Sequence, residues 1–480
     1  MAVTASAVAG ENLGNAISSR RMLVGAALGP LVAVAIWFAP LPLEPLAQHA
    51  LAVVAFMIVY WITEPIDHGI TALAGCFLFW ALNIAEFAVA FSGFADPTPW
   101  FLYGGLLLGE AAAITGVARR IGYGVIRLIG TSYARILMSI LVVVVILNFL
   151  IPSGMAQVAL LAPILMGIVA AFGLDPLSNV GRGLFVIVTY TCGLFNKMIL
   201  SGGSSILTHG MVQRLSGETI YWSEWLIAFL PMTLVTIFAC WFIILRLYPP
   251  ERNDLPGGQQ FIRDAAEKAG PWTADEKKTM AWMLLAIGLW ATDRLHHINP
   301  AIIAMGTGLA ITLPKVGVLT TKAIKQVNLL LIVFMAGALS MGEVLVQTKA
   351  IDVLTGTAMS WMTPFLGGPF LSTVVLFWTG FVYHFFLGSE LSMLSTSLPV
   401  IVNYATTQGF DVKAFSLIWN FSVTSKIFVY QSSVLMLGYA YGYFETKDLL
   451  KLGIVLTIVE GIILALLVPL YWPLIGLWTR

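Results

Sequence analysis

The strongest constraint on this chain is a set of apolar runs about as long as a membrane is thick. Such runs cover 22–40, 226–245 and 452–470. A helix needs ~20 consecutive, mainly apolar residues to cross the hydrocarbon core of a bilayer. Of the 480 residues, 59% are hydrophobic and only 10% are charged, whereas a soluble domain has about 25% charged residues. The sequence therefore predicts an all-α polytopic membrane protein.

The rest of the composition excludes several classes of protein. Residues 1–21 are small and polar and lack the regions of a signal peptide, so we expect a cytoplasmic N-terminal tail followed by a retained first helix. The three cysteines, Cys76, Cys192 and Cys240, lie in apolar stretches without metal-ligand spacing, which favours packing over a disulfide or a metal site. The net charge is +1 and no basic patch indicates nucleic acid.

Hydropathy and helix-breaking residues give the order of the elements. They predict about eleven transmembrane helices, near 22–40, 48–65, 69–91, 99–118, 183–212, 224–247, 278–293, 299–314, 327–347, 413–443 and 449–475. Two further segments, about 134–172 and about 366–407, contain breakers and are predicted to be re-entrant hairpins. With the N-terminus inside, 18 of the 25 lysines and arginines fall on the cytoplasmic side. This bias agrees with the positive-inside rule.

One long polar stretch, 248–277, divides the chain into two halves of similar layout. We interpret it as a cytoplasmic linker between inverted repeats. The first helix and N-terminal repeat cover 22–247, and the C-terminal repeat covers 278–480.

The two hairpins carry the same break. Residues 148–164 read NFLIPSGMAQVALLAPI and residues 384–400 read HFFLGSELSMLSTSLPV. Aligned without gaps, they share Phe149/Phe385, Ser153/Ser389 and Pro163/Pro399.

Two other features recur in both halves. A Gly-Glu pair is followed by Thr five residues after the Glu, at Glu110…Thr115 and at Glu343…Thr348. A lysine precedes a Ser-Ser pair inside an apolar helix, in NKMILSGGSSIL at 196–207 and in SKIFVYQSSVLM at 425–436.

Together these repeats indicate a secondary transporter. Such carriers are often built from inverted repeats, with a midplane site formed by broken helices. Irregular backbone at membrane depth is tolerated only where protein or a watery cavity satisfies it. Helix N-termini at such breaks suit an anion. We therefore predict that each break forms half of a binding site.

The chain also resembles the divalent anion:sodium symporter family over about 20–475, closest to bacterial citrate/succinate, tartrate/succinate and 2-oxoglutarate/malate translocators. The resemblance rests on WFLYGGLLLGEAAAITGVARRIGYGVIRLIG at 100–130, TIYWSEWLIAFLP at 219–231, LYPPE at 247–251 and AEKAGPWTADEKKTMAWMLLAIGLW at 266–290. It implies a homodimer in the bacterial inner membrane, in which an elevator-like transport domain moves against a scaffold domain.

The resemblance further implies that the hairpin tips and the loops in two broken helices bind the substrate. Carried over, these residues are Ser153, Gly154, Ser389 and Glu390 at the tips and Ser204, Ser205, Ser432 and Ser433 in the loops. Sodium sites would lie near Ser153, Gly202 and Ser389. The serine of the family's Ser-Asn-Thr tip motif is present at both tips, whereas the Asn and the Thr are absent from both.

Lys197 and Lys426 suggest how this departure is compensated. We hypothesise that their ammonium groups stand where relatives hold sodium and balance the charge of a dianion, which would favour sodium-independent exchange. The alternative is a structural ion pair between each lysine and an acid such as Glu110 or Glu343.

Glu390 has three interpretations. It is a proton-coupling carboxyl, a partner of Lys426, or a group that recognises a donor or a cation on the substrate. Other polar residues are weaker candidates. Thr208 and His209 are candidates to line the site, Asn148 and His384 are interpreted as structural hydrogen-bonding residues, and Glu460 is placed at an interface or a cavity.

The function predicted from the sequence is the transport of small divalent organic anions, by exchange or by cation-coupled symport. Sulfate or sulfonate transport is the alternative, followed by cation/proton antiport. An enzyme is not expected, because no HExxH, GxSxG or Asp-rich motif occurs. No cofactor is predicted, and sodium or protons remain open as coupling ions.

Overall fold

The computed structural model describes residues 2–258, 260, 264, 267 and 270–478. These residues form α-helices and short 3-10 helices, with one isolated bridge between Ser132 and Asp254. Seven of the described helices are long and apolar enough to cross a membrane, and the bent pair α5–α6 would make eight. The expected all-helical, multi-span architecture is therefore confirmed. The finer count of eleven crossings and two re-entrant hairpins stays a prediction.

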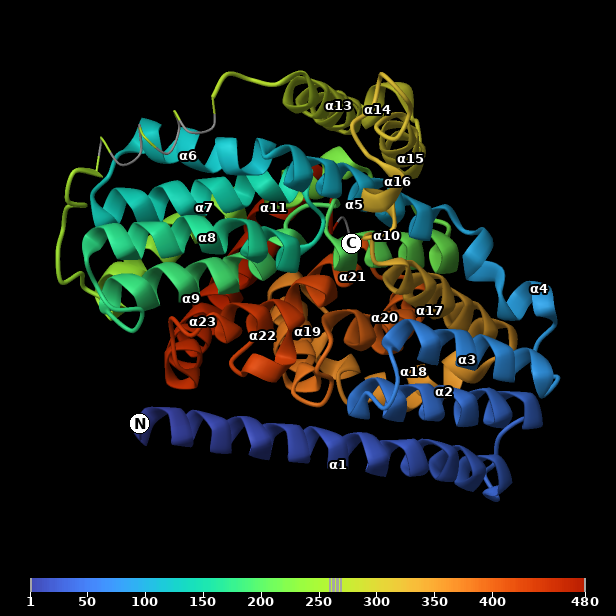
Figure 1. Cartoon of the computed structure of the whole chain (residues 1–480). Coiled ribbons are helices and arrows are strands. Elements are labelled where there is room, and N and C mark those ends of the chain that lie inside the picture. Colours follow the sequence, from blue (N-terminus) through green and yellow to red (C-terminus); the bar gives the residue numbers. More distant parts are fainter. Residues whose placement is uncertain (1, 259, 261–263, 265–266, 268–269, 479–480) are drawn as a thin grey trace.

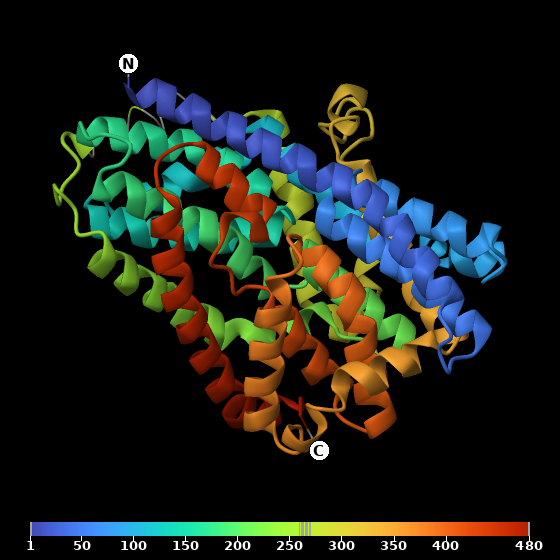
Figure 2. The ribbon, with the colours of Figure 1, turned by 90° about the horizontal axis from the view of Figure 1, so that it is seen from below.

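The first helices form one side of the molecule (Figure 1). They are α1 (Ala2–Phe38), α2 (Pro45–Thr63), α3 (His68–Ala81), α4 (Phe87–Ala90) and α5 (Pro97–Thr115), with the 3-10 turn η1 (Ser92–Ala95) before α5. The helix predicted over 22–40 begins at Ala2. Only 11% of the Arg20–Phe38 span is buried, and Figure 2 shows α1 running obliquely across one face of the molecule. Arg21 of α1 donates to Glu64 at the end of α2 at 2.6 Å.

Part of the second half of the chain packs on these helices. It comprises α13 (Ala274–Ala291), α14 (Asp293–His296), α15 (Pro300–Ala310), α16 (Thr321–Ile324) and α17 (Leu329–Gln347). Gly104 of α5 and Gly308 of α15 face each other so closely that a Cβ on Gly308 would lie 2.8 Å from the Gly104 Cα atom. Small residues allow such close packing of helices in a membrane. Residues 259, 261–263, 265, 266, 268 and 269 of the 248–277 linker lie outside the described residues.

The first predicted hairpin is the pair α7 (Tyr133–Leu150) and α8 (Gly154–Phe172), which lie side by side in Figure 1. Amphipathic α6 (Val117–Ile129) precedes them and turns by 68° from α5 at Gly116, whose φ is 86°. Arg120 of α6 donates to both carboxylate oxygens of Glu276, at 2.8 and 2.9 Å. Glu276 lies in the first turn of α13, before the predicted crossing, and this hydrogen bonding holds the pKa of its carboxyl below the usual range.

The helix predicted over 183–212 is interrupted. It consists of α9 (Asn179–Leu194), the 3-10 turn η2 (Phe195–Lys197) and α10 (Gly203–Ser216). The break in the α-helix covers residues 195–202 and ends at Ser201-Gly202, where glycine and serine leave the backbone free to depart from the helix. The 26-residue helix α11 (Trp222–Leu247) follows.

The remaining helices repeat this pattern. They are α18 (Ala350–Met359), which was not predicted, then α19 (Pro369–His384), α20 (Glu390–Gln408), α21 (Val412–Ser422), α22 (Ser433–Ala440) and α23 (Thr446–Tyr471), with 3-10 turns η3 (Thr363–Phe365), η4 (Val429–Gln431) and η5 (Trp472–Ile475). The pair α19–α20 is the second predicted hairpin. The helix predicted over 413–443 is split into α21 and α22, as α9 and α10 are.

Candidate functional site

The first hairpin turns at Ile151-Pro152-Ser153. Proline has no N–H to continue the helix. Ser153 is the N-cap of α8, and its hydroxyl accepts a hydrogen bond from the Ala156 N–H at 3.3 Å. A Cβ on Gly154 would lie 3.1 Å from both the Cys192 carbonyl oxygen and Val434 Cγ2. The first tip therefore packs directly against α9 and against α22 of the second half.

Three buried amides satisfy the backbone around this tip. Gln157 donates to the Ile151 carbonyl at 2.8 Å and to Asn148 Oδ1 at 3.1 Å. Asn196 donates to the Pro152 carbonyl at 3.3 Å and to Asn148 Oδ1 at 3.2 Å. Asn148 is thus a structural hydrogen-bonding residue, in agreement with the sequence analysis. Gln157 and Asn196 are not among the residues predicted from the sequence. A signal for them was available, since amides are uncommon beside a break in an apolar segment.

The serines of the first broken helix adjoin this network of amides. Gly202 is the N-cap of α10, and a Cβ there would overlap the carbonyl oxygen and the side chain of Asn196. Ser205 donates to the Asn196 carbonyl at 3.3 Å, while the buried Ser204 hydroxyl has no partner among the described residues. Gly202, Ser204 and Ser205 do not line the cavity described below.

The second hairpin tip is built like the first. Ser389 is the N-cap of α20, and its hydroxyl accepts from the Ser392 N–H at 3.4 Å. Ser432 is the N-cap of α22 and accepts from the Val434 N–H at 3.3 Å. The N-termini of α20 and α22 therefore lie close together at the second half-site.

A buried charge cluster connects the two halves. Glu390, the first residue of α20, forms ion pairs with both Lys197 and Lys426. The lysine side chains are each 3% exposed and the Glu390 side chain is 14% exposed. Ser432 also donates to Glu390 Oε1 at 3.1 Å. We name this set, Lys197, Glu390, Lys426 and Ser432, the charge cluster.

Backbone contacts hold both lysines of the charge cluster in place. Trp225 of α11 donates to the Lys197 carbonyl at 3.0 Å. Gln431 accepts from the N–H groups of Ile427 and Phe428, both at 2.8 Å, just after Lys426. Each break is thus hydrogen-bonded by the protein, as membrane-embedded irregular backbone requires.

Each lysine of the cluster does pair with an acid, but among the described residues that acid is Glu390 and not Glu110 or Glu343. Glu343 instead accepts from Arg214 at 3.0 Å. No ion pair of the described residues joins Glu110 to either lysine. Both lysines converge on Glu390, because the second hairpin tip lies between the two broken helices.

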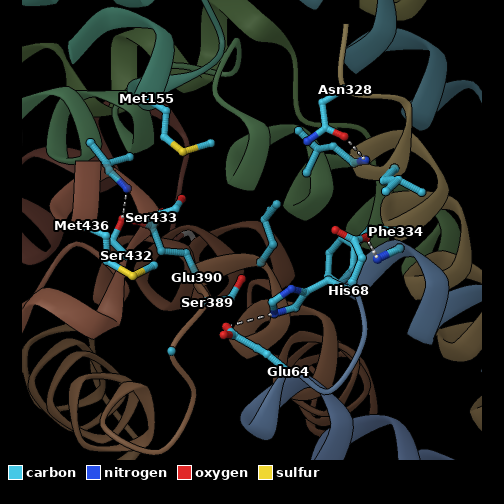
Figure 3. A pocket seen from close by; sticks show the side chains of 17 residues that line it. Glu64, His68, Met155, Asn328, Phe334, Ser389, Glu390, Ser432, Ser433 and Met436 are labelled. Atoms are coloured by element: carbon cyan, nitrogen blue, oxygen red, sulfur yellow. Dashed lines mark hydrogen bonds and ion pairs between the residues drawn. The ribbon is translucent and has the colours of Figure 1, made fainter. Parts of the chain in front are cut away.

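A cavity of about 330 Å³ opens beside the charge cluster (Figure 3). One wall consists of the second half-site, with Ser389, Glu390, Ser432 and Ser433, and Met155 comes from the first tip. The opposite wall comes from the α2–α3 turn and from α17. Its polar and aromatic residues are Glu64, Asp67, His68, Asn328 and Phe334.

Other candidates lie away from this cavity. Thr208 donates to Asn420 of α21 at 3.1 Å, and His209 is 3% exposed with its Nδ1 unpartnered among the described residues. His384, interpreted as a structural hydrogen-bonding residue, is fully buried, but neither ring nitrogen has a partner among the described residues.

Comparisons with known proteins identify the family of the chain. A family model described as the sodium:sulfate symporter transmembrane region matches residues 23–478. A membrane protein of Cupriavidus necator is 28% identical, with 94% of this chain and 92% of the relative covered. The chloroplastic dicarboxylate transporter 1 of Spinacia oleracea is 26% identical, with 95% and 82% covered.

Two further similarities bear on activity and fold. The citrate/succinate antiporter of Escherichia coli K12 is 24% identical, with 94% of this chain and 98% of the relative covered. The crystal structure of the YdaH transporter of Alcanivorax borkumensis superposes with a TM-score of 0.55 at 15% identity. It covers 80% of this chain and 87% of that one, which shows a shared fold.

Proposed function

The chain belongs to the sodium:sulfate symporter transmembrane family, and from that premise we propose that it moves small divalent organic anions, di- or tricarboxylates, across the membrane. Membership makes it a secondary transporter and confirms that it is not an enzyme. The relatives named for dicarboxylate and for citrate/succinate transport support the substrate class.

The observation that carries the proposal is the charge cluster beside the cavity. It contains two ammonium groups and one carboxylate, so one positive charge remains to balance an anion. The Ser389 and Ser433 hydroxyls and the N-termini of α20 and α22 supply hydrogen-bond donors, while the Ser432 hydroxyl donates to Glu390. The residual positive charge balances one carboxylate of a dianion, and these donors bind the other carboxylate.

We further propose that the tethered lysines replace sodium and favour exchange. Where the family's second sodium site would lie, near Ser389, the ammonium groups of the charge cluster stand beside Glu390. A charge at the bilayer centre costs roughly 2.5–3.5 kcal/mol on insertion scales. The site therefore crosses the membrane more easily when a bound anion neutralises the residual positive charge. This favours exchange, in which an anion is bound in both directions of movement. Near Ser153 and Gly202, where the other sodium sites would lie, the Ile151 and Pro152 carbonyls already accept hydrogen bonds from the Gln157 and Asn196 amides.

The wider arrangement is proposed as follows. The chain makes about eleven crossings in the bacterial inner membrane with the N-terminus in the cytoplasm, and its two hairpins are re-entrant within inverted repeats. Helices α1–α5 and α13–α17 form the scaffold, and α7–α11 and α19–α23 form the moving transport domain. Two copies assemble as a homodimer, which cross-linking in membranes would test.

The experiment is uptake of labelled succinate into proteoliposomes loaded with unlabelled succinate, with and without sodium. Uptake that needs internal succinate but no sodium would support exchange by tethered cations. A strict sodium requirement would restore sodium-coupled symport and leave the lysines as structural residues.

A sulfonate is the second candidate, because its single negative charge matches the single residual positive charge of the cluster. Sulfate is a further alternative substrate. Loading the same proteoliposomes with sulfate or a small sulfonate decides between these anions and succinate. Transport that responds to pH but to no anion would point to cation/proton antiport.

A further inference from the structure

A second ionisable group lies at membrane depth outside the charge cluster. Glu460 lies in the middle of α23 and is 1% exposed. Thr236 of α11 donates to Glu460 Oε2 at 3.3 Å, and Oε1 has no hydrogen-bond partner among the described residues. None of the ion pairs found in the described part of the chain includes Glu460.

The elements packed on Glu460 present no cation to it. The helices α9, α11 and α19 pack on α23. Their groups near Glu460, together with Thr457 of α23 itself, are Tyr190, Thr236 and Cys240. From α19, Phe377 and Trp378 pack on the next residue, Gly461. On α19, His384 faces the charge cluster, and the Lys426 ammonium is paired with Glu390.

These surroundings distinguish Glu460 from Glu390. Glu390 lies between two ammonium groups, which stabilise its ionised form. An isolated carboxylate buried without a cation is very costly, so such a group takes up a proton instead. A proton-coupling carboxyl is one interpretation of Glu390, but Glu460 has the surroundings that this role requires.

Glu460 is also connected to the second broken helix. Tyr190, a neighbour of Glu460, accepts from the Lys426 N–H at 3.5 Å. Gly453 of α23 packs on the Lys426 carbonyl so closely that any side chain there would overlap it. The Tyr190 hydroxyl and the helix that carries Glu460 therefore both contact the backbone of Lys426.

We propose that Glu460 is a proton-binding site and that its proton crosses the membrane together with the anion. The carboxylate takes up one proton from water on one side and returns it to water on the other, so no other reactant is consumed. This inference rests on the proposed function, because it assigns the coupling ion of the same carrier. It takes exchange as the favoured but not the obligatory mode, since net proton-coupled uptake needs the carrier to return without an anion.

The test uses the full-length protein in liposomes whose membrane voltage is clamped. Exchange of labelled for unlabelled succinate at equal pH on both sides reports the carrier. Net succinate uptake driven by an inward gradient of one pH unit reports coupling, with up to about tenfold accumulation per proton carried. We expect Glu460→Gln to retain exchange and to lose the gradient-driven accumulation. Glu460→Asp, which keeps the carboxyl, should retain both.

Glu110→Gln is the matched control, because it makes the same change in α5 and should leave the gradient response intact. The inference is overturned if wild-type protein exchanges succinate but ignores the pH gradient, or if Glu460→Gln responds like wild type. If Glu460→Gln also loses exchange, infrared spectroscopy of wild type and Glu460→Asp decides: a protonated carboxyl band that changes during turnover supports the site, and its absence overturns it. Wild-type protein that shows no exchange overturns the proposed function and the inference with it.

Discussion

At the scale of single residues, the charge cluster explains why two lysines remain at membrane depth. Both lysine residues are 2% exposed, and each has Glu390 as its ion-pair partner. Breaking a buried pair costs about 3–5 kcal/mol, because the remaining charge is left uncompensated. In this cluster the carboxylate would keep one partner, so we expect a loss of transport before a loss of fold.

We predict that Lys197→Met and Lys426→Met each reduce sodium-independent succinate exchange by about tenfold or more, because the cluster would become neutral. Initial exchange rates in proteoliposomes, normalised to incorporated protein, measure this. Lys322→Met, on the exposed surface of α16, is the control and should exchange like wild type. Unchanged rates in both cluster variants would show that the lysines do not compensate substrate charge.

Glu390→Gln should strengthen substrate binding, in contrast to the two lysine variants. It leaves two positive charges in the cluster, so a dianion binds more tightly and is released more slowly. We expect KM for succinate to fall by about two- to tenfold together with the maximal rate. Concentration series for this variant and for the exposed Glu86→Gln give both constants. A raised KM would mean that Glu390 itself contacts the substrate through a donor or a cationic group.

The cluster also shows how far sequence reasoning extends at this scale. Charged residues are rare in apolar segments, so Lys197, Glu390 and Lys426 could be recognised as candidates. Their pairing could not be derived, because Lys197 and Glu390 are separated by 193 residues and meet only after both halves have folded. The same holds for Asn196, whose partner Pro152 lies in the turn between α7 and α8.

At the scale of elements, the breaks depend on residues that permit or satisfy irregular backbone. The two helix pairs could be located closely, since Pro152-Ser153-Gly154 and Gly388-Ser389 interrupt long apolar runs. That the pairs are re-entrant stays a prediction. The expected limits 134–172 agree with the observed Tyr133–Leu150 and Gly154–Phe172. The short helix α18 was missed, because its 10 residues are fewer than a crossing requires and gave no spanning signal.

Two neighbouring glycines at the first break allow a matched test. A Cβ on Gly202 would overlap Asn196, whereas a Cβ on Gly203 meets nothing within 4 Å. Overpacking of this kind costs about 1–3 kcal/mol. We therefore expect Gly202→Ala to lower the melting temperature of the detergent-solubilised protein by about 2 °C or more and Gly203→Ala to leave it unchanged. Equal melting temperatures for the two variants would mean that the break adapts freely.

At the scale of the whole molecule, the cavity lies between the two proposed domains. Its walls come from the α2–α3 turn and α17 on one side and from the second tip and α22 on the other (Figure 3). The predicted topology places Glu64, Asp67 and Asn328 at the cytoplasmic ends of their helices. The structure therefore corresponds to an inward-facing state in this proposal.

This orientation predicts which side of the membrane reaches the cavity. All three native cysteines are buried. In Ser433→Cys, the introduced thiol is therefore the accessible one among the described residues. We expect an impermeant maleimide to label Ser433→Cys about tenfold faster in inside-out than in right-side-out vesicles, and succinate to slow the labelling because it occupies the same cavity. Glu218→Cys, in an exposed loop assigned to the other side, is the control and should show the reverse preference. Faster labelling of Ser433→Cys from outside would invert the topology, while labelling that succinate does not slow would separate this cavity from the transport site.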